Sequence, residues 1–212
     1  MRSVSEMEWG DFSNLQLDAV REVGNIGTGN AATALSQLLG RAVDMGVPEA
    51  DLIPIYELAG RYGSPETPVC AVLIRAEGDF PCNLIFVIDE GAGQELANLL
   101  IAMDISTLDP ELQIQMRDSA LGEVGNIILG AFLNAISMLT GYVLPASVPA
   151  VAHDMLGSVM DIVASIFGVI GDTALLVKTS LQVKDVECEV NGNVIMVPDP
   201  GSLETLLQKL GV

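Results

Sequence analysis

Two long segments of the chain carry apolar residues at the spacing of an amphipathic helix. In residues 14–39 one face collects the apolar side chains Leu17, Val20, Val23, Ile26, Ala31, Ala34, Leu35 and Leu38. This spacing predicts a helix, which Asp11 or Ser13 can cap at its start and Gly40 at its end. The second predicted helix starts at Asp109-Pro110, an N-cap followed by proline at the first helical position, and runs to about residue 140.

Shorter segments complete the predicted fold. Strands are expected at 42–47, 52–58, 69–75, 82–88, 173–183 and 192–197, and helices at 91–102, 149–167 and 202–210. In the helix at 149–167, Asp154 and Asp161 are expected to face solvent. Strands and helices do not alternate strictly, so a doubly wound parallel sheet is not expected. The order favours an α+β fold in which long helices flank a mostly antiparallel sheet.

The chain contains an internal repeat. Leu15–Pro48 aligns with Met116–Pro149 at a fixed offset of 101 without a gap, and 13 of the 34 positions are identical. Chance would give about two identities at ordinary residue frequencies. The sequence therefore predicts two tandem copies, about 15–104 and 109–212, within a single compact domain spanning 1–212. Two similar halves in one body imply pseudo-twofold symmetry, with the strands of both halves joined in one sheet.

The charge balance excludes some classes of partner. The chain has 28 Asp and Glu residues against 9 Lys and Arg residues, a net charge of −19. Nucleic acids and anionic membrane surfaces both attract proteins largely through Lys and Arg, so neither is an expected partner. Only Lys178, Lys184 and Lys209 are lysines. Acidic excess with few lysines fits either a halophile protein adapted to molar salt or an ordinary acidic protein, since net charge aids solubility in both.

One uncharged stretch, Val124–Ala152, has 29 residues and is long enough to span a bilayer. Its asparagines and prolines and its non-basic flanks argue against a membrane span, and a buried helix followed by a buried strand is expected instead. The N-terminal residues are acidic and lack the apolar core of a secretory signal. Three cysteines without ligand spacing imply neither a disulfide framework nor a zinc site, so a cytoplasmic location is expected.

Each copy places a polar stripe on its long helix. The spacing i, i+4, i+7 occurs twice, as Asp18-Glu22-Asn25 and as Ser119-Glu123-Asn126. On a helix this spacing puts the three side chains on one face. Such a stripe is either a solvated polar face or a surface on which a carboxylate and an amide contact the same external object. Its recurrence in both copies favours the second interpretation. The single histidine, His153, cannot supply a multi-histidine metal site and is expected on a helix surface.

Two glycines recur beside these stripes. Gly24 and Gly29 of the first copy correspond to Gly125 and Gly130 of the second. A glycine inside a helix costs about 1 kcal/mol relative to alanine, so something must offset that cost twice. Close packing of the helix is one explanation. Access for the backbone of a partner beside Asn25 is the other.

The complete pattern, Asp/Ser-x3-Glu-x2-Asn-x22-Pro, resembles the motif of the CheC/CheX/FliY family of chemotaxis phosphatases. It occurs here as Asp18, Glu22, Asn25 and Pro48, and again as Ser119, Glu123, Asn126 and Pro149. Within that family, two complete sites in about 200 residues resemble the CheC branch. CheX-type chains carry one functional site and dimerise, and FliY-type chains carry an added motor-switch domain.

The resemblance implies hydrolysis of the aspartyl phosphate on the response regulator CheY-P. Asn25 and Asn126 would each orient the attacking water, and Glu22 and Glu123 would pair with the active-site lysine of the receiver. No cofactor of its own is expected, because the receiver supplies Mg²⁺. The resemblance also implies a second partner, the receptor deamidase CheD, bound through Asp154. A monomer is expected. The alternative is a non-catalytic adaptor that binds CheD or the motor.

Overall fold

The computed structural model describes residues 13–58, 60, 63–101, 103–167, 173–186 and 188–212. Its centre is a six-stranded sheet with the order β1-β5-β6-β3-β2-β4, in which every neighbouring pair is antiparallel. The strands are β1 (Val43–Pro54), β2 (Pro68–Ala76), β3 (Cys82–Asp89), β4 (Ala150–Met155), β5 (Thr173–Val183) and β6 (Cys188–Pro198). The predicted antiparallel sheet is confirmed.

The sheet has the symmetry expected of two similar halves. In chain order, β1, β2 and β3 of the first half correspond to β4, β5 and β6 of the second half. Exchanging each strand for its counterpart turns the sheet order into its own reverse. A pseudo-twofold axis therefore passes between β3 and β6, at the centre of the sheet. This confirms the predicted fold class.

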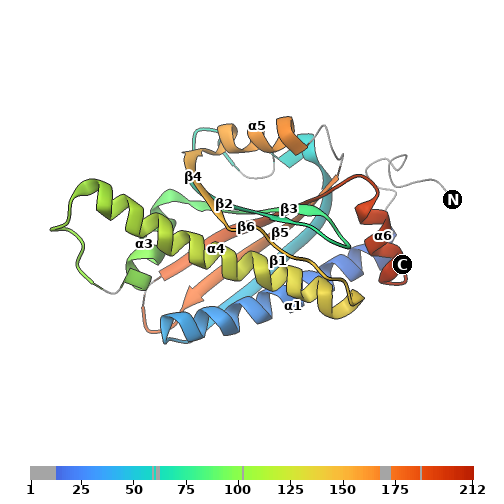
Figure 1. The fold of residues 1–212 in the computed structure, drawn as a ribbon, viewed down its shortest axis with the longest axis horizontal. Helices are drawn as coiled ribbons and strands as arrows, with labels where there is room; N and C mark the ends of the chain where they lie inside the picture. The colour runs from blue at the N-terminus through green and yellow to red at the C-terminus, as the bar shows by residue number, and fades with distance from the viewer. Residues whose placement is uncertain (1–12, 59, 61–62, 102, 168–172, 187) are drawn as a thin grey trace.

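Four helices cover one face of the sheet: α1 (Asn14–Leu39), α3 (Glu90–Ile101), α4 (Pro110–Thr140) and α6 (Ser202–Lys209). The two long helices, α1 and α4, run antiparallel across this face (Figure 1). Ser13 caps α1 in a capping box with Gln16, and Gly40 ends it in the left-handed conformation. Asp109 caps α4, with Pro110 in its first turn. The predicted ends of both helices are confirmed, except that Asp11 lies outside the described residues.

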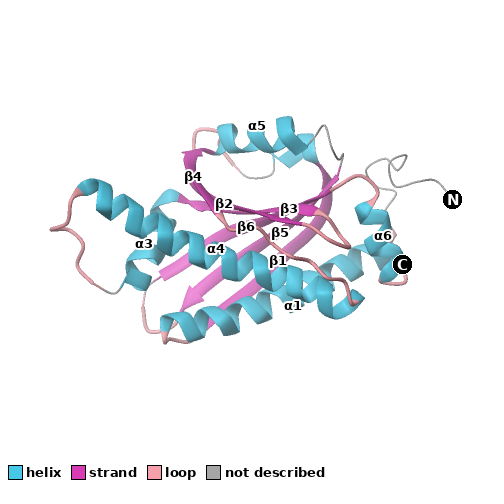
Figure 2. Ribbon diagram, in the orientation of Figure 1, coloured by secondary structure: helices cyan, strands magenta, loops and turns pink. Residues whose placement is uncertain are grey.

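The other face of the sheet carries a smaller apolar core. It is covered by α5 (Leu156–Phe167) and by the short 3₁₀ helix η2 (Ile55–Glu57), which occupy corresponding places in the two halves (Figure 2). From α5, Leu156, Val159 and Val163 pack onto apolar side chains of the sheet. The sheet is therefore buried between two unequal layers, and the thicker layer contains both long helices.

The prediction of one helix over residues 149–167 was wrong in its first part. Residues 150–155 form β4, which pairs with β2 in the register Cys70↔His153, and α5 begins only at Leu156. Pairing with a neighbouring strand outweighed the local helical spacing, as tertiary contacts commonly do. The first half also differs from expectation: a single strand, β1, replaces two predicted strands and carries an irregularity between Gly46 and Glu49.

Helix α4 accounts for most of the long uncharged stretch. Among the described residues it is the helix that is long and apolar enough to cross a bilayer. However, 61% of its most apolar 18-residue segment is buried inside the fold. Its fully buried side chains lie in the core between the helices and the sheet and include Ile128, Leu129 and Phe132. The buried helix is thus confirmed, whereas the strand expected to be buried after it, β4, is mostly exposed.

Candidate functional site

The first polar stripe lies on the solvent face of α1. Asp18, Glu22 and Asn25 are exposed, whereas the neighbouring Val20 and Val23 are buried in the core. The apolar residues fix the rotation of the helix because they must face the sheet. The stripe is consequently presented outward from a rigid element.

The second stripe occupies the corresponding part of α4. Ser119 and Glu123 are exposed, and Asn126 is half-buried. Pro149, from the loop before β4, lies beside this part of the helix, because a Cβ built on Gly122 would be 4.0 Å from its Cγ. The motif proline of the second copy thus stands next to the turn that carries Glu123. Pro48 lies in β1 within the irregularity after Gly46.

The two long helices touch closely between the motifs. A Cβ built on Gly27 of α1 would come within 3.0 Å of the Phe132 ring of α4. Both motifs precede this contact in their own helices. Because the helices run antiparallel, the two motifs lie on opposite sides of the contact (Figure 1). The structure therefore brings the three residues of each stripe together and keeps the two stripes apart, as two sites.

The supporting motif residues already have partners within their own helices. Asp18 accepts a hydrogen bond of 3.1 Å from Arg21, and the Ser119 hydroxyl donates to the carbonyl of Gln115 at 2.8 Å. By contrast, the side chains of the two Glu/Asn pairs, Glu22-Asn25 and Glu123-Asn126, make no hydrogen bond or ion pair with any other described residue. Both pairs retain their hydrogen-bonding capacity for an external object.

The recurring glycines serve two different purposes. A Cβ on Gly125 would lie 2.5 Å from the Cβ of Val72 on β2, so close packing of α4 on the sheet is confirmed there. At Gly29 and Gly130 an added Cβ would meet no atom within 4 Å. Packing does not explain these two positions, and access for a partner remains the explanation.

Both motifs lie in segments that match a known protein family. The family model described as CheC-like matches residues 15–50 and 116–153, which contain both motifs. The chain is 36% identical over 196 residues to the CheY-P phosphatase CheC of Bacillus subtilis, covering 92% of this chain and 94% of that protein. The chain belongs to the CheC-like family. The prediction of a phosphatase is thereby confirmed.

Solved structures agree with this CheC-like fold. Thermotoga maritima FliY superposes with a TM-score of 0.73 at 19% identity, covering 95% of this chain and 98% of that one. The chain of a CheX–CheY–BeF₃–Mg²⁺ complex from Borrelia burgdorferi gives a TM-score of 0.54 at 18% identity, with coverages of 86% and 99%. At these identities the likeness extends to the fold alone.

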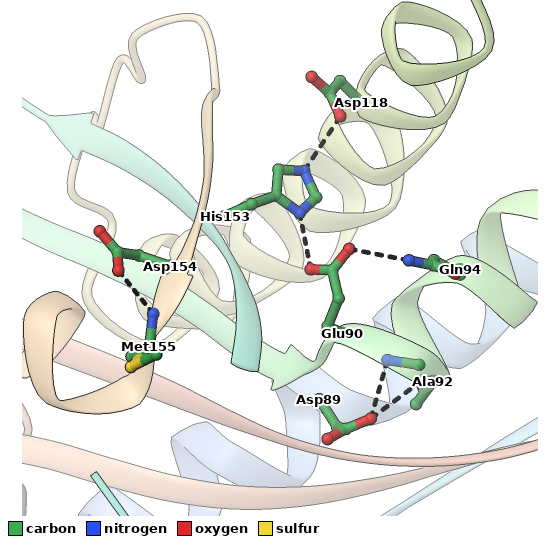
Figure 3. A network of polar contacts seen from close by, with 9 residues as sticks. Asp89, Glu90, Ala92, Gln94, Asp118, His153, Asp154 and Met155 are labelled. Carbon is green, nitrogen blue, oxygen red and sulfur yellow. Dashed lines mark hydrogen bonds and ion pairs between the residues drawn. The ribbon is translucent and has the colours of Figure 1, made fainter. Parts of the chain in front are cut away.

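In this CheC-like chain, Asp154 lies on the edge strand β4 and not on a helix as predicted. Its side chain is exposed, and Oδ1 accepts a hydrogen bond of 2.7 Å from the backbone of Met155. Adjacent residues of a strand point to opposite faces, and His153 points toward α4 (Figure 3). Asp154 therefore faces away from the helix that carries the second motif.

His153 joins three elements in a network that the sequence did not indicate. Its Nδ1 lies 2.7 Å from Oε2 of Glu90 on α3, and its Nε2 lies 3.0 Å from Oδ1 of Asp118 on α4 (Figure 3). Partial burial alone would lower the pKa of His153, but the hydrogen bonds and charges of both carboxylates outweigh burial and raise it. The expected helix-surface histidine is instead a link between the sheet edge and the helical layer.

Proposed function

We propose that this CheC-like chain hydrolyses the aspartyl phosphate of the chemotaxis response regulator CheY-P at two sites. The observation that carries the proposal is the repeated Glu/Asn pair on a long helix, without a side-chain partner among the described residues. Three of the four side chains are exposed and Asn126 is half-buried. Each pair sits in a motif within the family-matched residues. A protein partner in the cytoplasm suits such an outward-facing site better than a small molecule would.

In the proposed mechanism, the asparagine positions the attacking water. The side-chain amide of Asn25 or Asn126 accepts a hydrogen bond from water and donates one to a phosphoryl oxygen. The water attacks phosphorus in line, the bond between phosphorus and the receiver aspartate breaks, and inorganic phosphate leaves. Phosphoryl transfer needs mainly positioning and charge stabilisation, so an amide that does not titrate is sufficient.

The glutamate of each pair fixes the docking of the substrate. Glu22 or Glu123 would form an ion pair with the active-site lysine of the receiver, which specifies orientation more than it adds affinity. The Mg²⁺ beside the phosphoryl group belongs to the receiver and enters as part of the substrate. Asp18 and Ser119 would shape the docking surface around the pair. One copy of the chain contains both sites, so a monomer is sufficient.

The direct test is hydrolysis of CheY-P by the purified chain. CheY is phosphorylated with acetyl phosphate, the donor is removed, and phosphate release is followed with and without the protein. The proposal requires faster release at substoichiometric amounts of the chain. Binding of CheY-P without acceleration would assign the chain to the adaptor class.

A second candidate function is binding of the deamidase CheD through Asp154. The exposure of β4 at the sheet edge, with Asp154 turned away from α4, favours a partner surface separate from the phosphatase sites. Asp154→Lys should reduce CheD binding in a pull-down and leave CheY-P hydrolysis intact, because a charge reversal in an interface can cost several kcal/mol and an exposed one costs little stability. Retained CheD binding with reduced hydrolysis would place β4 in the phosphatase surface.

A further inference from the structure

A groove runs along the contact between α1 and α4 and begins at the second site. Asn126, Gly130, Asn134 and Met138 line it from α4, and Asn30 and Ala34 line it from α1. The four α4 residues are spaced by four, so they form one stripe along that helix. The groove thus continues the surface of the second Glu/Asn pair for about 18 Å toward the end of α4.

Three amides in this groove have unused hydrogen-bonding capacity. Asn30 and Asn134 are exposed and Asn126 is half-buried, and none of them makes a side-chain hydrogen bond to any residue that the structure describes. Each amide can donate two hydrogen bonds and accept up to two. Met138, at the far end, is 71% exposed. The groove therefore combines neutral polar groups with an apolar end.

Gly130 keeps the groove open beside Asn126. Beyond the backbone of its own helix, an added Cβ would meet no described atom within 4 Å, and alanine would favour the helix by about 1 kcal/mol. The packing of the chain itself gives no reason for glycine at this position. The open space is available to an external molecule that approaches Asn126.

We propose that this groove seats part of the phosphorylated receiver and that Asn30 and Asn134 bind polar groups of the receiver there. The inference rests on the proposed function. Its occupant follows from continuity, since Asn126 must reach the phosphoryl group and also lines the groove. Asn134 lies eight residues after Asn126, about 12 Å further along the helix. A standard interface covers about 800 Å² on each partner, which is large enough to include both asparagines.

The groove also distinguishes the two sites. At the offset of 101, Asn30 corresponds to Ala131 and Asn134 corresponds to Thr33. The Thr33 hydroxyl already donates to the carbonyl of Gly29 at 3.0 Å. The first site therefore lacks the two additional amides. Asn30 and Asn134 line the same groove as Asn126, so we expect them to determine specificity at the second site, with α1 contributing to the site carried by α4.

The test isolates the second site in an Asn25→Ala background. KM and kcat for CheY-P, and Kd for CheY loaded with BeF₃⁻ and Mg²⁺, are measured for Asn30→Ala and Asn134→Ala. Loss of one hydrogen bond should raise KM and Kd about threefold to tenfold in each variant, with kcat within about twofold. Thr33→Ala is the matched control and should change neither constant.

Gly130 gives a second, steric test in the same background. Gly130→Ala should fold stably and retain most of the affinity, whereas Gly130→Leu should fill the groove and raise Kd more than about tenfold. Thermal unfolding of every variant establishes that it is folded. A loss of affinity in Gly130→Leu at unchanged melting temperature would support the groove as a receiver contact.

The outcomes separate this inference from the proposed function. All variants are compared in the Asn25→Ala background. If Asn126→Ala abolishes hydrolysis there while KM and Kd stay unchanged in Asn30→Ala, Asn134→Ala and Gly130→Leu, the groove proposal is wrong and the phosphatase mechanism stands. If Asn126→Ala leaves hydrolysis unchanged, the proposed mechanism itself is wrong. If the substitutions instead abolish a concentration-dependent self-association of the chain, the groove binds a second copy and the receiver assignment is overturned.

Discussion

The charge of His153 is set by two carboxylates from different helices. Glu90 and Asp118 lie within 3.0 Å of its two ring nitrogens, and the charge of Arg117 also acts on Glu90. Partial burial alone would raise the pKa of Glu90, but hydrogen bonds from His153 and Gln94 outweigh it and lower that pKa. Both shifts favour the ionised pair that links β4 to α3.

The two shifts predict a pH window for this network. The pKa of His153 is raised in the fold, so its stabilisation is complete below its ordinary value of 6.5 and is lost as pH rises through the folded-state value. The pKa of Glu90 is lowered, so its stabilisation is complete above 4.5 and is lost as pH falls through the folded-state value. The network contributes most between about pH 4.5 and 6.5.

His153→Gln tests this window. The variant should lower the melting temperature at pH 6, and this effect should shrink as pH rises, because the wild-type histidine loses its proton as pH passes through its raised pKa. Melting temperatures measured across pH 5–9 give the comparison. A constant difference at every pH would mean that the ion pairs contribute no pH-dependent stability.

At the residue scale, the sequence predicts which residues lie together where their relationship is local. Asp18, Glu22 and Asn25 are linked by helical spacing, and the structure places them together on one exposed face. The partners of His153 lie 63 and 35 residues away in sequence. No local pattern connects them, because only the pairing of β4 with β2 brings them together.

At the scale of elements, the glycines of α4 predict opposite effects of the same substitution. Gly125→Ala places its Cβ 2.5 Å from Val72 and should destabilise the fold by about 1–3 kcal/mol, as overpacking of a core does. Gly130→Ala enters open space and should stabilise it by up to about 1 kcal/mol. Chemical denaturation of the two variants beside the wild type measures both changes. Equal effects would contradict the assigned packing.

The two long helices were predictable from sequence because spacing and capping residues agree. Ser13, Gly40 and Asp109-Pro110 are local signals, and the structure uses all of them. Strand β4 was not predictable in this way. Its residues at 150–155 lead directly into α5, and only the free edge of β2 makes them a strand.

At the scale of the whole molecule, the internal repeat predicted the sheet symmetry. A match of 13 positions in 34 implied two similar halves, and the strand order is unchanged when the halves are exchanged. The unequal layers could not be predicted from the repeat. The second half has the 12-residue helix α5 at the place where the described residues of the first half include the three-residue η2.

The net charge of −19 predicts a dependence of stability on salt. Repulsion between like charges destabilises the compact state, and 1 M salt reduces the Debye length to about 3 Å. If the chain is adapted to high salt, its melting temperature should rise between 0.1 and 3 M KCl. A melting temperature that stays constant over this range would identify an ordinary acidic protein.

The central claim is that Asn25 and Asn126 each position the hydrolytic water. Removing a positioned catalytic group commonly costs 10²-fold or more in rate, so each single Asn→Ala change should remove the contribution of its own site. The double variant should then lose nearly all activity at an unchanged melting temperature, because both side chains lie outside the buried core. The deciding measurement is the rate of phosphate release from CheY-P with wild type, Asn25→Ala, Asn126→Ala and the double variant. The folded double variant should release phosphate at close to the background rate, and release at the wild-type rate would contradict the role of the two asparagines.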